Sequence, residues 1–316
     1  MAKLNRIDQK LLYGILFGGW HLFSCLPFFI HYLISDFLYL LIYYVARYRR
    51  KVVRKNLMNS FPEKTEMELR AIERKFYLHF CDLMVESVKY FSISRSGIMK
   101  HLQFKGLDSV ERSCRNGKSC AVYLGHYGNW EWISSLQLWL DPSIGKCVQL
   151  YHPLENPVFD KLIGYSRERL GSTNIPMEQS LRHIVKYRKE GIPLVIGFIA
   201  DQVPLPWNIH YWSNFLNQDT PFFTGGERLA RQLDMDVYYM EIQRVRRGYY
   251  TVEFHLLTDN AKGCEEFAIT EMYSRDLDKN IRQNPPYWLL SHNRWKRTRA
   301  SWMQYKKEEQ ERKAKV

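Results

Sequence analysis

Hydrophobic and polar positions divide the chain into three stretches with different patterns. Residues 11–46 are almost entirely apolar, with Asp36 as the one acidic residue and no Lys or Arg. Within residues 56–91, apolar side chains recur at near-helical spacing, which predicts a long amphipathic helix. From about residue 100 onward, short apolar runs alternate with helical stretches, a pattern typical of βαβ units.

The third stretch predicts an α/β fold. Apolar runs predict strands at residues 119–124, 146–151 and 193–200, separated by helical stretches around residues 130–140, 156–170 and 177–190. Residues 236–257 indicate two alternating strands around an Arg-Arg-Gly turn, which would add an antiparallel pair. We therefore expect a mixed, mostly parallel sheet flanked by helices, followed by a basic, solvated helix in the tail.

The apolar stretch at the N-terminus predicts attachment to a membrane. It exceeds the ~20 residues that a spanning helix needs, but Pro27 would kink or break a single helix. Basic residues flank both ends: Lys3, Arg6 and Lys10 before it, and six Lys or Arg residues between Arg47 and Lys55 after it. Two basic flanks favour a helical hairpin or an interfacial anchor over one crossing. The alternative is a pair of buried core helices in a soluble protein.

Composition and charge narrow the class of protein. Hydrophobic residues make up 46% and charged residues 25% of the 316 residues, which excludes disorder and coiled coils. A mean hydropathy of −0.40 excludes a polytopic membrane protein. The formal net charge of +13 indicates an acidic partner, such as nucleic acid, anionic lipid or an acidic protein. The six Cys residues form no CxxC pair, which indicates reduced thiols rather than disulfides or a zinc site.

The segment GHYGNWEW, residues 125–132, follows a predicted strand and carries the candidate chemistry. Ligands of open α/β sheets bind at the carboxyl ends of strands, so His126 is well placed for catalysis. With His126 in the loop and Glu131 in the first helical turn, the two side chains can converge, and a carboxylate would then orient the imidazole. Asn129 can cap the following helix. The alternative is a capping loop with an incidental histidine.

Five ordered motifs, spread over roughly residues 10–300, resemble one known family. They are YRRKVVRKNLMNSFPE (48–63), GHYGNWEW (125–132), DQ (201–202), TPFFTGGERLA (220–230) and WLLSHNRWK (288–296). The chain resembles the lipid A late acyltransferases, a branch of the lysophospholipid-type glycerolipid acyltransferases. The resemblance implies a glycerolipid acyltransferase-like fold and an O-acyltransferase without a cofactor or metal. The enzyme would move a fatty acyl chain from acyl-carrier protein to a hydroxyl of a lipid A precursor; other glycolipids, aminolipids or glycerolipids are the alternative acceptors.

The resemblance also implies roles for single residues. His126 matches the general base and Glu131 the acid that orients it. Arg169, rather than Arg167, matches a basic residue of the substrate pocket. Asp201 matches an acid beside the site, unless it is an ordinary helix cap, and Gln202 and Asn129 are further candidates for substrate binding.

The implied organisation is a membrane-anchoring segment (1–46), a catalytic domain (47–300) and a basic tail (301–316). Acyl-carrier protein and a phosphorylated glycolipid are both anionic, and both fit the net charge of +13. We therefore expect a protein of the inner membrane whose catalytic domain faces the cytoplasm. Nucleic acid is not an expected partner, because the basic residues gather beside the apolar segment and in the tail.

Overall fold

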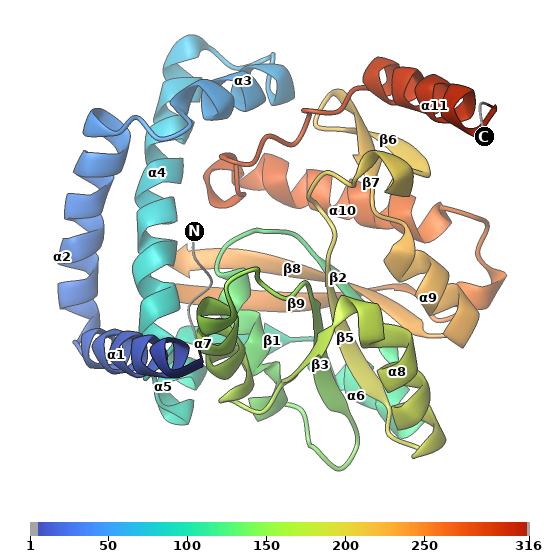
Figure 1. The fold of residues 1–316 in the computed structure, drawn as a ribbon, viewed down its shortest axis with the longest axis horizontal. Coiled ribbons are helices and arrows are strands. Elements are labelled where there is room, and N and C mark those ends of the chain that lie inside the picture. Colours follow the sequence, from blue (N-terminus) through green and yellow to red (C-terminus); the bar gives the residue numbers. More distant parts are fainter. Residues whose placement is uncertain (1–5, 315–316) are drawn as a thin grey trace.

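A seven-stranded mixed sheet forms the centre of the protein, in a computed structural model that describes residues 6–314 (Figure 1). The strand order is β1-β9-β8-β2-β5-β3-β4. All neighbouring strands run parallel except β8 and β9, which are antiparallel. The strands are β1 (Leu102–Lys105), β2 (Cys120–Leu124), β3 (Lys146–Tyr151), β4 (Thr173–Pro176), β5 (Leu194–Ile199), β8 (Asp236–Arg246) and β9 (Tyr249–Thr258). The predicted mixed, mostly parallel sheet is confirmed.

Helices surround this sheet. They are α1 (Arg6–Ser24), α2 (Phe28–Tyr39), α3 (Arg50–Ser60), α4 (Glu66–Lys89), α5 (Arg95–His101), α6 (Leu107–Arg115), α7 (Pro157–Glu168), α8 (Ser180–Lys189), α9 (Gly225–Leu233), α10 (Ala268–Gln283) and α11 (Arg299–Ala314). The segment predicted as a helix at 130–140 is a 3-10 helix, η2 (Trp130–Leu138). A separate two-stranded hairpin, β6 (Tyr211–Phe215) and β7 (Gln218–Phe222), was not predicted.

The centre of the sheet places two loops side by side. All five residues of β2 are buried, and β2 pairs in parallel with β5. In this register Leu124 lies opposite Ile199, so both strands end at the same level. The loops that follow them, beginning at Gly125 and Ala200, therefore meet at the carboxyl edge of the sheet, where ligands of such sheets bind.

Helix α4 is the longest helix and supports this edge from one side. Its start is fixed by a capping box, in which Thr65 and Glu68 each bond the other's backbone amide. Helix α2 lies along α4 at the side of the molecule (Figure 1). Several polar residues of α4 are buried rather than solvated, among them His79, Asp82 and Glu86.

The N-terminal segment forms two helices that break at Pro27, the N-cap of α2. Helix α1 packs against α7, and α2 continues into a short π-helix, Leu40–Val45. Residues 28–45 are long and apolar enough to cross a membrane, and 17% of them are buried in the structure, unlike a core helix. Lys3, part of the predicted basic flank, lies outside the described residues. The boundaries of the three predicted parts stay a prediction.

Candidate active site

His126 lies in a tight loop between β2 and η2. Gly128 in this loop has a φ of +56°, and a Cβ on it would meet Cγ2 of Ile242 at 2.7 Å. Only glycine combines this left-handed conformation with so close an approach. The loop is therefore drawn against β8, and the side chain of His126 is left half-buried at the carboxyl edge of the sheet.

A segment from the C-terminal part of the chain clamps the same loop. The amide of Leu289 donates to the carbonyl of His126 (3.0 Å), and the amide of Gly128 donates to the carbonyl of Tyr287 (2.9 Å). Tyr127 and Trp288 form an isolated antiparallel bridge. Part of the motif WLLSHNRWK is thus structural support for the loop that carries His126.

Asp201 is the carboxylate that contacts His126. Nδ1 of His126 lies 2.5 Å from Oδ1 of Asp201, and the backbone amide of His126 donates to Oδ2 (2.8 Å). The indole Nε1 of Trp288 donates to the same oxygen at 2.8 Å. The Asp201 side chain is 2% exposed. Because three donors fix this carboxylate, it holds the imidazole in one orientation.

The electrostatics favour an ionised Asp201 beside a basic imidazole. Burial alone would raise the pKa of the Asp201 carboxyl, but His126 and the donated hydrogen bonds lower it to about 2. Burial alone would lower the pKa of His126, but the charge and hydrogen bond of Asp201 outweigh burial and raise it. Asp201 thus makes the imidazole a better proton acceptor.

Nε2 is the nitrogen of His126 that is left to accept a proton. With Nδ1–H donating to Asp201, Nε2 carries the lone pair. The side-chain Nε2 of Gln202 lies 3.2 Å from it and donates to it. The sequence candidates His126, Asp201 and Gln202 are therefore brought together by the two loops after β2 and β5.

Glu131 makes a different contact from the one expected. We expected it to orient His126, but its carboxylate bonds the guanidinium of Arg167, with distances of 2.9 Å (Nη2 to Oε1) and 3.1 Å (Nε to Oε2). The pair is close enough to act on His126 through charge, because Glu131 raises and Arg167 lowers the pKa of the imidazole. Its role in catalysis stays a prediction.

An apolar cavity opens beside these groups. Trp130, whose ring meets that of His126 edge-on at 5.1 Å, is part of its lining, as are Glu131 and Arg167. The rest of the lining is mostly apolar and comes from β2, β3, β5, β8, η2 and the residue before β4: Val122, Leu124, Ile133, Ser134, Leu136, Cys147, Val148, Gln149, Leu150, Tyr151, Ser172, Val195, Gly197, Ile199 and Met240. The empty space amounts to ≈ 680 Å³, part of it open to solvent.

Two sequence candidates have structural contacts instead of facing the cavity. The guanidinium of Arg169 donates to the backbone carbonyls of Tyr90 (2.9 Å) and Ile93 (2.7 Å). Asn129 is fully buried; its oxygen caps η2 at the amide of Trp132, and its amide group donates to Glu86. Arg167, and not Arg169, lines the cavity, and the substrate-binding roles of Arg169 and Asn129 stay predictions.

The sequence reasoning missed Trp288 and Arg167 as members of the site. Arg167 sits on the last turn of α7, two residues before Arg169, so helix phase decides which arginine faces the cavity. A helical wheel could have found it, whereas no local signal points to Trp288. Within residues 6–314, no group of three or more His, Cys, Asp and Glu side chains is placed to hold a metal ion.

Comparison with known proteins identifies the family of this chain. Residues 3–297 match the family described as bacterial lipid A biosynthesis acyltransferase. A curated relative, a lipid A biosynthesis acyltransferase of Haemophilus influenzae, is 22% identical over 146 residues. That alignment covers 46% of this chain and 45% of the relative, so the chain spans about half the length of the curated relative it matches. On the match to nearly its whole length, the chain belongs to the family of bacterial lipid A biosynthesis acyltransferases.

Proposed function

We propose that this protein transfers a fatty acyl chain from acyl-carrier protein to a hydroxyl group of a lipid A precursor. The observation that carries the proposal is the position of the His126–Asp201 pair next to an apolar cavity at the carboxyl edge of the sheet. A base beside an apolar channel suits a reaction that joins a hydroxyl to an acyl chain. Membership of the family supports the same reaction class.

In the proposed mechanism His126 acts as general base and then as general acid. Nε2 of His126 takes the proton of the acceptor hydroxyl, and the hydroxyl oxygen attacks the carbonyl carbon of the acyl thioester. The tetrahedral intermediate collapses, the C–S bond breaks, and the departing thiolate takes the proton from Nε2. Asp201 stabilises the imidazolium between the two steps. General acid–base catalysis of this kind contributes about 10²–10⁴-fold to the rate.

The cavity would hold the acyl chain, with its polar end at Glu131 and Arg167. Most of its lining is apolar, and its one ion pair is that of Glu131 and Arg167. Arg167 is the cationic donor of the lining, so it is our candidate for stabilising the oxyanion of the intermediate. Gln202 donates to Nε2 and would give way to the acceptor hydroxyl at that position.

The outer face of α2 supports contact with the membrane. Phe29, Leu33 and Phe37, spaced four residues apart, are 65%, 64% and 59% exposed. His31 and Ser35 on the opposite side of α2 are fully buried. On α2 apolar residues face outward and polar residues face inward, which is the reverse of a surface helix of a soluble protein. It fits a helix whose outer face lies in lipid, where a bilayer-bound acceptor resides.

Basic side chains continue from this apolar face. Arg47, Arg49, Lys51 and Lys55 lie on and just before α3, and among the described residues none of them forms an ion pair. Arg49 donates to the carbonyl of Ser291, close to residues 287–289, which clamp the loop that carries His126. Each basic residue near an anionic surface adds about 1 kcal/mol of attraction. We place this face on the cytoplasmic leaflet of the inner membrane, where it would also attract an acidic carrier protein.

The test is an acyl-transfer assay with purified protein, acyl-acyl-carrier protein and lipid A precursor in mixed micelles, followed by mass spectrometry of the lipid. We expect one added acyl chain, and a rate about 10²–10⁴-fold lower for His126→Ala at equal folded fraction. A panel of phospholipid, glycolipid and aminolipid acceptors runs in parallel. Full activity of His126→Ala would overturn the mechanism, and preference for another acceptor would overturn the substrate assignment.

A further inference from the structure

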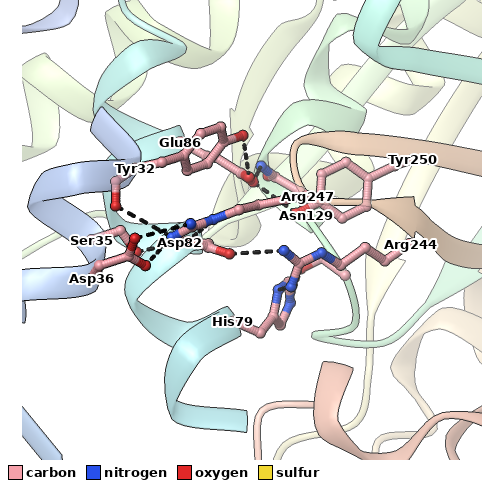
Figure 2. A network of polar contacts seen from close by, with 11 residues as sticks. Tyr32, Ser35, Asp36, His79, Asp82, Glu86, Asn129, Arg244, Arg247 and Tyr250 are labelled. Atoms are coloured by element: carbon pink, nitrogen blue, oxygen red, sulfur yellow. Dashed lines mark hydrogen bonds and ion pairs between the residues drawn. The ribbon is translucent and has the colours of Figure 1, made fainter. Parts of the chain in front are cut away.

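A largely buried polar cluster joins α2, α4 and the β8–β9 hairpin to the loop that carries His126. Figure 2 shows its side chains turned toward one another between these elements. The labelled members are Tyr32, Ser35, Asp36, His79, Asp82, Glu86, Asn129, Arg244, Arg247 and Tyr250. None of them belongs to the proton-transfer chemistry described above. Such a cluster is costly to bury unless its charges are paired and hydrogen-bonded.

Two carboxylates form the centre of the cluster. Asp82 and Glu86 are one helical turn apart on α4 and therefore share a face. Asp82 accepts from Arg244 (2.8 Å) and Arg247 (2.9 Å), and Oγ of Ser35 donates to it at 2.7 Å. Two guanidinium groups thus compensate the charge of Asp82, and Glu86 is left to other partners.

Glu86 is fully buried and binds three different parts of the chain. Its Oε2 accepts from Nδ2 of Asn129 and from the hydroxyl of Tyr250, both at 2.8 Å. Its Oε1 accepts from the hydroxyl of Tyr32 on α2 at 3.0 Å. Its backbone carbonyl accepts from Nε1 of Trp132 at 3.2 Å. One residue therefore contacts the segment on both sides of Glu131 and contacts α2 as well.

His79, two turns earlier on α4, holds the loop at a second point. Burial and the nearby Arg244 lower the pKa of His79 to about 3, so the ring is neutral. Nδ1 accepts from Arg244 (3.2 Å), which leaves Nε2–H to donate to the carbonyl of Gly128 (3.3 Å). Helix α4 thus binds the loop at Gly128, Asn129 and Trp132.

The opposite side of the cluster is closed by α2 and the hairpin turn. Gly248 in this turn has a φ of +74°, and a Cβ on it would come within 2.0 Å of the Tyr32 hydroxyl. Asp36 bonds Arg247 at 2.6 Å. The inner face of α2 is therefore in direct contact with the groups that bind the catalytic loop, while its outer face carries Phe29, Leu33 and Phe37.

We propose that Glu86 is a positioning residue for acyl transfer, which fixes the loop carrying His126 through Asn129 and ties that loop to the lipid-facing helix α2 through Tyr32. The inference rests on the proposed function, because turnover is its readout. Asp201 is held by β5 and Trp288, and not by α4, so movement of the loop would shift His126 relative to its partner.

The test compares Glu86→Ala with Glu86→Gln and with Asp236→Ala. Asp236 is also a buried carboxylate, but it lies at the opposite end of the sheet, beside Ser113 and Lys118. Asp236→Ala therefore controls for loss of stability alone. A misplacement of about 1 Å costs about 10²-fold in rate, so we expect Glu86→Ala to lower kcat by about 10- to 100-fold per folded molecule with little change in KM. Glu86→Gln keeps an acceptor for Asn129 and Tyr250 and should restore most of kcat.

Tyr32→Phe keeps the test decisive if Glu86→Ala does not fold. It removes the hydrogen bond between α2 and Glu86, and we expect kcat to fall several-fold at constant KM on vesicle-bound acceptor. Wild-type kcat in Tyr32→Phe would overturn the tie to α2. An active wild type in which Glu86→Ala and Asp236→Ala have equal kcat would overturn the positioning role alone. An inactive wild type would instead contradict the proposed function.

Discussion

Glu131 and Arg167 share two hydrogen bonds with each other and form none with His126. The two charges act on His126 in opposite directions, since Glu131 raises and Arg167 lowers its pKa. Both side chains are about a quarter exposed, so solvent screens this effect only in part. Burial and Asp201 have the largest effects on the pKa of His126, and Glu131 and Arg167 add two smaller, opposing effects.

We expect opposite shifts of the pH–rate profile from the two single substitutions. General-base activity is lost as pH falls through the pKa of His126, and the profile of kcat/KM reports that pKa in the free enzyme. Glu131→Gln should move the acid limb to lower pH, and Arg167→Gln should move it to higher pH. In the double variant the shifts should largely cancel. Two shifts in the same direction would contradict this electrostatic account.

Asp201→Asn tests the carboxylate that contacts His126. The substitution keeps the shape of the side chain but removes the charge that raises the pKa of His126. We expect a loss of kcat close to that of His126→Ala, about 10²–10⁴-fold, and an acid limb at lower pH for the residual activity. The loss should exceed that of Glu131→Gln. A larger effect at Glu131 would restore it as the orienting acid.

The sequence could reveal those parts of the site whose residues lie close together along the chain. His126 was identifiable because a buried strand, a glycine and a helix start lie within ten residues of it. Its partner Asp201 is 75 positions away, and only the parallel pairing of β2 with β5 brings the two together. The sequence therefore favoured Glu131, five residues from His126. A different limit applies to β1 and β4, which have four residues each and are too short to show a periodic pattern.

Exposed apolar side chains on α2 should control vesicle binding. Burial of such a side chain contributes about 1.5 kcal/mol or more, so the triple variant Phe29→Ser, Leu33→Ser and Phe37→Ser should weaken partitioning by more than about a hundredfold. The free energy of unfolding should change little, because these side chains do not pack in the core. Sedimentation with anionic vesicles measures the effect, and Leu256→Ser, at an exposed position of β9, is the control. Equal sedimentation of both variants would remove the lipid-facing role of α2.

These point substitutions are a sharper test than deletion of residues 1–46. Helix α2 covers Asp82 and Glu86, and Ser35 and Tyr32 satisfy them. Deletion would expose this buried cluster and disturb the catalytic loop, whether or not the helix meets lipid. Loss of activity after deletion would therefore not distinguish anchoring from support.

Glu86 should make stability depend on pH in an unusual direction. Burial and the neighbouring Asp82 raise its pKa from 4.5 to about 7, against the donated hydrogen bonds of Tyr250 and Asn129 and the charge of Arg244. Between these two values the folded state binds more protons than the unfolded state, so the free energy of unfolding falls as pH rises. Glu86→Gln lacks this titration. As the pH rises from about 5 to about 7, the melting temperature of the wild type should therefore decrease relative to that of Glu86→Gln.

The depth of the cavity should set the acyl chain length. Gly197 lies in its wall on β5, and the nearest atom to an added Cβ is Cδ2 of Leu124 at 4.0 Å, so a larger side chain can enter the space. Gly197→Leu should favour shorter acyl donors in a competition assay. The side chain of Ile196 points to the other face of the sheet, so Ile196→Leu should not change the preferred acyl chain length. Unchanged preference in Gly197→Leu would place the acyl chain elsewhere.

The clamp by residues 287–289 has a consequence for the order in which the protein becomes active during synthesis. His126 and its strand leave the ribosome long before residues 287–289, which clamp its loop, and Trp288 is also a donor to Asp201. The apolar helices α1 and α2 emerge before both of these segments. On the proposed lipid-facing role of α2, a nascent chain would reach the bilayer before His126 and Asp201 are held together, and a chain that stops before Trp288 would lack the clamp on the loop of His126.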